Sequence, residues 1–136
     1  MALDKGLQGN ETIEKAILAL QEQTSQEMLA HALTVVRRRM KEGGQLIVAV
    51  DPPKTSGQME VQILKTQDGR TWWAAFTSFE EEMKGSGAVM STFMADIRQL
   101  FEAAASEETI CGIIINPWNR TLMLNKALIR IVLGKE

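Results

Sequence analysis

The chain has 136 residues, of which 45% are hydrophobic and 24% charged, and its formal net charge is −2. This length is typical of one domain, and it allows roughly two thirds of the unfolded surface to be buried without a metal or a disulfide. The small negative charge disfavours a broad electrostatic contact with nucleic acid. With Cys111 as its one cysteine, the chain can form no intrachain disulfide.

The amino-terminal sequence carries no signal for export or for membrane insertion. Residues 1–10 are polar and lack an apolar core, so we expect a loose lead-in. No apolar stretch reaches the length of a membrane span. We therefore expect a cytoplasmic protein without membrane contacts, consisting of a single domain over residues 1–136 with no second, carboxy-terminal domain.

Helical periodicity predicts two helices in the first third of the chain. The first follows a cap at Asn10 or Thr12, and the second begins at a capping-box pattern, Thr24-Ser25-Gln26-Glu27. Gly43-Gly44 ends the second helix, because glycine accepts the left-handed conformation of a helix exit. The apolar positions at helical spacing are Ile13, Ile17, Leu20, Leu29, Leu33, Val36 and Met40.

The middle of the chain reads as strands. Residues 45–50 form a β-branched run that Asp51-Pro52-Pro53 ends. Residues 61–66 and 71–76 flank an Asp-Gly pair, which predicts a β-hairpin. Thr77-Ser78 followed by Glu80–Glu82 indicates a capped helix start, and we prefer this interpretation to a paired-carboxylate site.

The last third alternates helices and strands. We predict a helix over residues 91–105, a strand buried on both faces over 110–116, a short strand over 121–124 and a final helix capped by Asn125. The predicted fold is therefore mixed α/β. Amino-terminal helices precede a mixed sheet of about four or five strands that contains a hairpin, and helices pack on that sheet.

This order of elements resembles the amino-terminal domain of the SseB family, named for enhanced serine sensitivity in bacteria. The resemblance rests on the strand 46–50, on Phe76-Thr77-Ser78, on Ile115-Asn116-Pro117 and on the segment Leu122–Ile129. It covers about residues 27–133. It implies a mixed α/β domain of a bacterial cytoplasmic protein and implies no particular reaction.

The usual catalytic residue types are scarce. The chain has one histidine, His31, which we interpret as a surface partner of Glu27 rather than a metal ligand. Cys111 stands at the start of an apolar strand without a basic neighbour in sequence, and we interpret it mainly as a small buried hydrophobe. We expect no cofactor and no metal, and we favour a protein that is not an enzyme.

Three groups of residues are candidate binding sites. The first is a basic cluster, Arg37, Arg38, Arg39 and Lys41, which suits a phosphate or an acidic partner or else only a solvated face. The second is a pair of tryptophans, Trp73 and Trp118. Because Trp72 and Trp73 are adjacent on a strand, they must point to opposite faces, and one of them is a candidate for a partner or self-association surface.

The third group lies at strand ends. Asp51, Ser78 and Asn116 each follow a predicted strand, and ligands of open α/β sheets bind at the carboxyl ends of strands. The three residues would converge if their strands were parallel neighbours. The alternative is that Ser78 and Asn116 only satisfy turn and helix-start backbone.

The leading functional hypothesis is a non-enzymatic protein-interaction or regulatory module that binds a protein partner or another copy of itself. One alternative is a small-ligand sensor at the strand ends. Another is a thiol-dependent enzyme or carrier in sulfur or amino-acid metabolism that uses Cys111.

Overall fold

The computed structural model describes residues 7, 9–51, 60–61, 63–78, 91–117 and 121–134. Within these ranges the helices are α1 (Glu11–Glu22), α2 (Gln26–Lys41), α4 (Ile97–Ser106) and α5 (Lys126–Leu133). The strands are β1 (Gln45–Asp51), β2 (Glu60–Val61), β3 (Ile63–Lys65), β4 (Thr71–Phe76), β5 (Ser91–Asp96), β6 (Gly112–Ile115) and β7 (Leu122–Asn125). The predicted mixed α/β fold is confirmed.

All seven strand segments belong to one mixed sheet. The path β2-β1-β4-β6-β7 runs across it, with β5 added to β1 and β3 added to β4. Among the described strands, only β4 and β6 are parallel, whereas β1 is antiparallel to β4, β5 and β2. The carboxyl ends of β4 and β6 therefore lie side by side, and the carboxyl end of β1 lies at the opposite end of the sheet.

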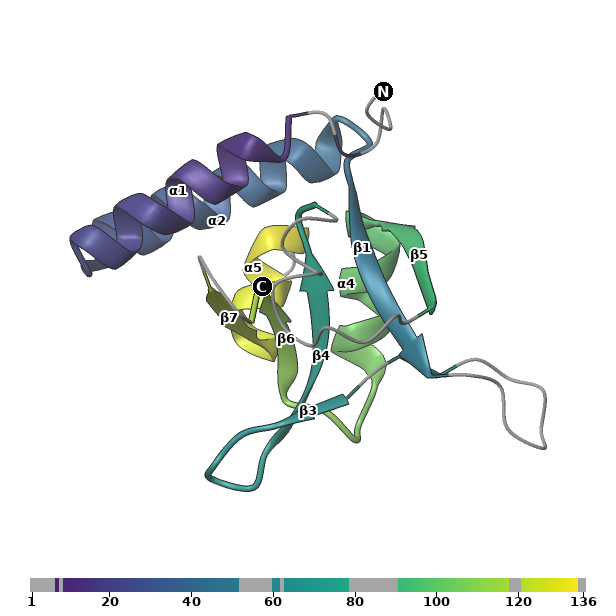
Figure 1. Ribbon diagram of the computed structural model, residues 1–136. Coiled ribbons are helices and arrows are strands. Elements are labelled where there is room, and N and C mark those ends of the chain that lie inside the picture. Colours follow the sequence, from purple (N-terminus) through teal and green to yellow (C-terminus); the bar gives the residue numbers. More distant parts are fainter. Residues whose placement is uncertain are drawn as a thin grey trace.

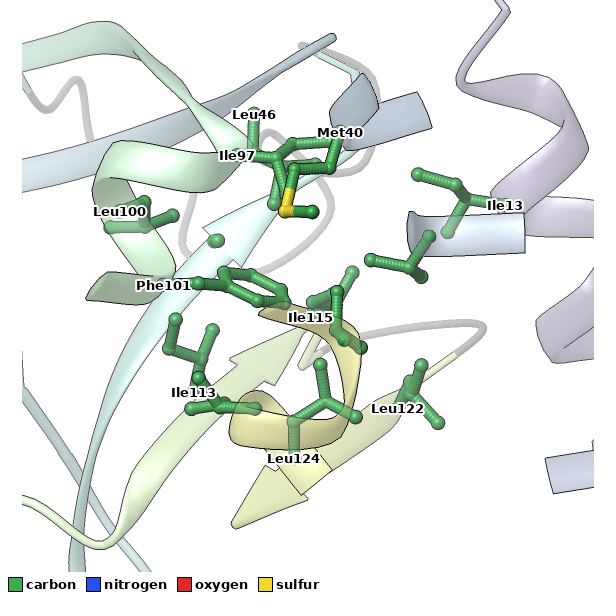
Figure 2. Close-up of a cluster of buried hydrophobic side chains, with 14 of the residues drawn as sticks. Ile13, Met40, Leu46, Ile97, Leu100, Phe101, Ile113, Ile115, Leu122 and Leu124 are labelled. Carbon is green, nitrogen blue, oxygen red and sulfur yellow. The ribbon is translucent and has the colours of Figure 1, made fainter. Parts of the chain in front are cut away.

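The described helices fall into two pairs, α1 with α2 and α4 with α5, and both pairs pack against the same core of the sheet. In Figure 1, α1 and α2 run alongside each other across one end of the sheet, while α4 and α5 lie behind its strands. Figure 2 shows Phe101 of α4 among side chains of the sheet that include Ile113 and Ile115. These three side chains are fully buried, and they belong to a core cluster that draws on all four helices.

The helix caps follow local sequence signals, with one correction. Asn125 caps α5 as predicted, accepting a hydrogen bond of 2.9 Å from the Leu128 amide. In α2, however, the cap is Ser25 and not Thr24, because the Ser25 hydroxyl accepts from Met28 N at 3.1 Å. Thr24 instead donates to the Leu20 carbonyl of α1.

The predicted helix over residues 91–105 begins six residues too early. Residues Ser91–Asp96 form β5, whose six residues pair with β1 in an unbroken antiparallel register. Met94, which we expected to be buried on the helix, is 36% exposed opposite Ile47. Helix α4 then begins at Ile97, and the predicted burial of Leu100, Phe101 and Ala104 is confirmed.

The hairpin at Asp68-Gly69 is confirmed: Gly69 has φ +85°, and Thr66 N donates to Arg70 O at 2.9 Å. In this turn the Thr66 hydroxyl, then the Arg70 amide and charge, lower the pKa of exposed Asp68. Strand β6 is buried along its whole length between β4 and β7, as predicted. The predicted helix start after Ser78 falls on residues 79–90, outside the described residues.

Candidate functional site

Two of the motifs that carry the family resemblance, Phe76-Thr77-Ser78 and Ile115-Asn116-Pro117, contact each other directly. Thr77 follows β4 and Asn116 follows β6, and the parallel pairing of these strands places them side by side. Asn116 Oδ1 accepts from Thr77 N at 2.9 Å, and Asn116 Nδ2 donates to Thr77 Oγ1 at 3.0 Å. This reciprocal pair continues the strand pairing past the last ladder bond, through a side chain instead of a backbone.

Asn116 reaches this position through an unusual backbone conformation. Its φ is +53°, the left-handed region in which asparagine is tolerated better than most residues. Its amide N donates to Ala75 O at 2.8 Å, and its carbonyl accepts from the Thr121 hydroxyl at 2.7 Å. The residue is fully buried, and each of its polar groups has a partner.

Asn10 connects the end of β4 and the start of β1 to the amino-terminal helices. Its Nδ2 donates to the backbone carbonyls of Gln45, at 2.8 Å, and Thr77, at 3.1 Å. Its Oδ1 accepts from Arg39 Nε of α2 at 3.1 Å. Asn10 or Thr12 was predicted to cap α1. Asn10 does occupy the N-cap position, but its side chain accepts no capping hydrogen bond and is used in these tertiary contacts instead.

Glu14 of α1 completes the group, because its Oε2 accepts a hydrogen bond from the Thr77 hydroxyl. We call these five residues, Asn10, Glu14, Arg39, Thr77 and Asn116, the polar clasp. The four buried polar side chains found in the described residues all belong to it: Asn10, Arg39, Thr77 and Asn116. The clasp joins α1, α2 and the ends of β4 and β6 at one point.

The chemistry of the clasp is structural. Buried polar groups are costly unless they are hydrogen-bonded, and these amide and hydroxyl groups satisfy one another. The Thr77 hydroxyl donates to the Glu14 carboxylate and accepts from the Asn116 amide, but Thr77 is only 1% exposed, so this hydroxyl is not accessible to a substrate in this conformation. The interpretation of Asn116 as a residue that satisfies backbone groups is therefore the one that the geometry favours.

The strand-end residues do not converge as a ligand site would require. Because β1 is antiparallel to β4, Asp51 lies at the far end of the sheet from Ser78 and Asn116. The condition of three parallel neighbours is not met. Ser78 is half-buried next to Thr77, and Asn116 is fully buried, so its side chain cannot reach a ligand in this conformation.

The tryptophans take the alternating positions that a strand imposes. Trp72 is buried, and its indole Nε1 donates to the Thr66 hydroxyl at 3.3 Å. Trp73 points to the other face, where it is half-buried against the core and lies opposite Ile63 of β3. Ile63 is 49% exposed. Trp118, the other candidate, lies outside the described residues.

The basic cluster divides into a buried and an exposed part. Arg39 is buried in the clasp and forms an ion pair of 2.9 Å with Glu42, so its inclusion in a surface patch was wrong. Arg37, Arg38 and Lys41 are exposed on α2. The helix positions explain the division, because Arg39 shares the buried stripe of Val35, Val36 and Met40.

Cys111 lies directly before β6, and His31 lies on α2. Cys111 is half-buried and its backbone N donates to Thr71 O at 2.8 Å, while His31 is exposed on α2. In the described part of the chain, no three His, Cys, Asp or Glu residues come close enough together to hold a metal ion. Over the same residues, no helix has the length and apolar character needed to cross a membrane. A thiol-dependent activity of Cys111 stays a prediction.

Sequence reasoning missed three members of the clasp. Glu14 and Arg39 looked like ordinary surface charges, and Asn10 looked like a helix cap. The signal in the sequence was their position. Asn10 and Arg39 both lie at helical spacing from the apolar residues of their helices, and so on the buried side of each helix.

Comparison with known families supports the structural assignment. The model for the SseB protein N-terminal domain matches residues 13–130, which is most of the chain. The protein therefore belongs to the SseB family, and the part of that family that it matches is the amino-terminal domain. No curated protein and no solved structure matches the chain. The matched range includes Thr77 and Asn116 and excludes Asn10.

Proposed function

We propose that this domain is a non-enzymatic protein-interaction or regulatory module, and that Ile63 and Trp73 contribute to its contact surface. The observation that carries the proposal is their cross-strand pairing at a partly exposed position. Large apolar and aromatic side chains that stay accessible are enriched in the cores of protein interfaces. The polar clasp also supports the proposal, because the hydrogen bonds of Thr77 and Asn116 give these candidate site residues a structural role.

The partner surface would be built on rigid elements. Trp73 is held by the core cluster and by β4, which is paired on both sides, with β3 on one and β6 on the other. A ring held in this way loses little side-chain entropy when a partner covers it. Ile63 would supply the neighbouring apolar contact area.

Site-specific photo-crosslinking in cells tests this proposal. A benzophenone amino acid at position 63 is expected to give a discrete adduct with one protein, or with a second copy of the chain. The matched control is the same amino acid at position 18, because Leu18 is 41% exposed but lies on α1.

The proposal predicts a discrete adduct from position 63 that position 18 does not give. It also predicts that this adduct is lost when Trp73→Ala is added to a protein that still folds. Identical adducts from both positions, or no adduct from position 63, would contradict it. Circular dichroism of each purified variant checks the fold.

A further inference from the structure

The second surface of interest is a group of cations where α2 meets α5. Arg37 and Lys41 lie one turn apart on the exposed side of α2, and Arg130 is exposed on the last turn of α5. The guanidinium of Arg37 reaches the end of α5: a Cβ placed on Gly134 would lie 3.0 Å from Arg37 Nη2. Arg130 is four residues before Gly134 and so on the same side of that helix. We call Arg37, Lys41 and Arg130 the cationic seam.

Within the described residues, no carboxylate neutralises the seam. The ion pairs found there are Arg39–Glu42 and Arg70–Asp68, neither of which includes a seam residue. Glu42, the nearest acidic residue along α2, is held by Arg39. Helix α5 contributes no acidic residue of its own.

Like charges are also spaced unfavourably on both helices. Arg37 and Lys41 are four residues apart, as are Lys126 and Arg130, and like charges at this spacing destabilise a helix. The carboxyl end of a helix carries about half a negative elementary charge, which offsets only part of three positive charges. An anionic partner would remove the remaining repulsion.

The surroundings of the seam favour a protein over other anions. Ile131, next to Arg130, is 53% exposed, so the surface combines cations with an apolar side chain. Arginine together with apolar groups is typical of protein interfaces. Nucleic acid binding depends on many phosphate contacts, which three cations on a chain of net charge −2 do not supply.

We propose that the cationic seam binds an acidic segment of a partner protein, with Asp or Glu carboxylates paired to Arg37, Lys41 and Arg130 and an apolar residue against Ile131. This inference does not depend on the surface formed by Ile63 and Trp73, so either one can fail without the other.

Fluorescence anisotropy with a short labelled peptide rich in Glu and Leu tests the proposal. The seam variant is R37A/K41A/R130A, and the matched control is K15A/K65A/R98A, which removes the same charge from exposed positions elsewhere. At low salt, the seam variant is expected to bind at least about tenfold more weakly than the unaltered protein, and the control to lose less than about twofold.

Three results would overturn the proposal: no binding by the unaltered protein, equal weakening in both triple variants, or stronger binding of a single-stranded oligonucleotide or of inorganic phosphate than of the peptide. The substituted residues are all exposed, so both variants are expected to fold, and circular dichroism confirms this. Unchanged crosslinking from position 63 in the seam variant separates this result from the proposed function.

Discussion

Asn116 combines a positive φ, which is uncommon in residues other than glycine, with complete burial of its side chain. It adopts a positive φ of +53°, and it is fully buried with its side-chain amide bonded to Thr77. Asparagine tolerates this conformation, and its amide matches the two groups that Thr77 presents. The asparagine before Pro117 is therefore explained by backbone geometry and hydrogen bonding.

Among the described glycines, Gly112 has the least space for a side chain. A Cβ added there would lie 1.9 Å from the Leu124 carbonyl oxygen on the paired strand β7. We predict that Gly112→Ala lowers the free energy of unfolding by about 3 kcal/mol or more, because β6 and β7 must separate. Urea denaturation measures the change.

Gly43→Ala is the control for this substitution. Gly43 also has a positive φ, +82°, but a Cβ there would meet no atom within 4 Å. Its substitution should cost only the backbone strain, about 1–2 kcal/mol. Equal losses of unfolding free energy in the two variants would show that the close approach of the Leu124 carbonyl to Gly112 does not add to the cost of the substitution.

At the scale of elements, the start of α2 shows how a local signal can be displaced by one residue. Thr24 and Ser25 are both capping residue types, and the sequence pattern with Glu27 selects Thr24. The structure selects Ser25, because Thr24 is used by the end of α1. The short connection between α1 and α2 decides which hydroxyl is free.

We predict that Ser25→Ala destabilises the protein by about 1 kcal/mol, since the Met28 amide loses its acceptor. Thr24→Ala should change the free energy of unfolding by less than about 0.5 kcal/mol. Thermal unfolding followed by circular dichroism compares the two. The opposite order would restore the sequence-based assignment of the cap.

Strand β5 shows where sequence reasoning about elements stops. Met94, Ile97 and Phe101 fit a helical period, which favoured one long helix. The six residues before Ile97 instead pair with β1, whose paired residues lie 41 to 51 positions earlier in the chain, and this tertiary pairing overrides the local pattern. The Asn125 cap of α5, the hairpin and β6 were predictable because their signals are local.

At the scale of the whole molecule, the polar clasp is the feature that the sequence could not show. Asn10 and Thr77 are 67 positions apart, and Thr77 and Asn116 are 39 apart. The resemblance singled out Thr77 and Asn116, but only the parallel pairing of β4 with β6 brings them together. The clasp fastens the amino-terminal helices to the sheet, so we expect its loss to weaken the whole domain.

A double-mutant cycle between Thr77 and Asn116 tests this claim most directly. Thr77→Val removes the hydroxyl, and Asn116→Gly removes the amide while keeping the positive φ accessible. We predict that each substitution lowers the free energy of unfolding in urea by about 1–3 kcal/mol, because buried partners are left unsatisfied. The two losses should couple by about 1 kcal/mol or more. Losses that are absent, or that simply add, would contradict the structural role of the clasp.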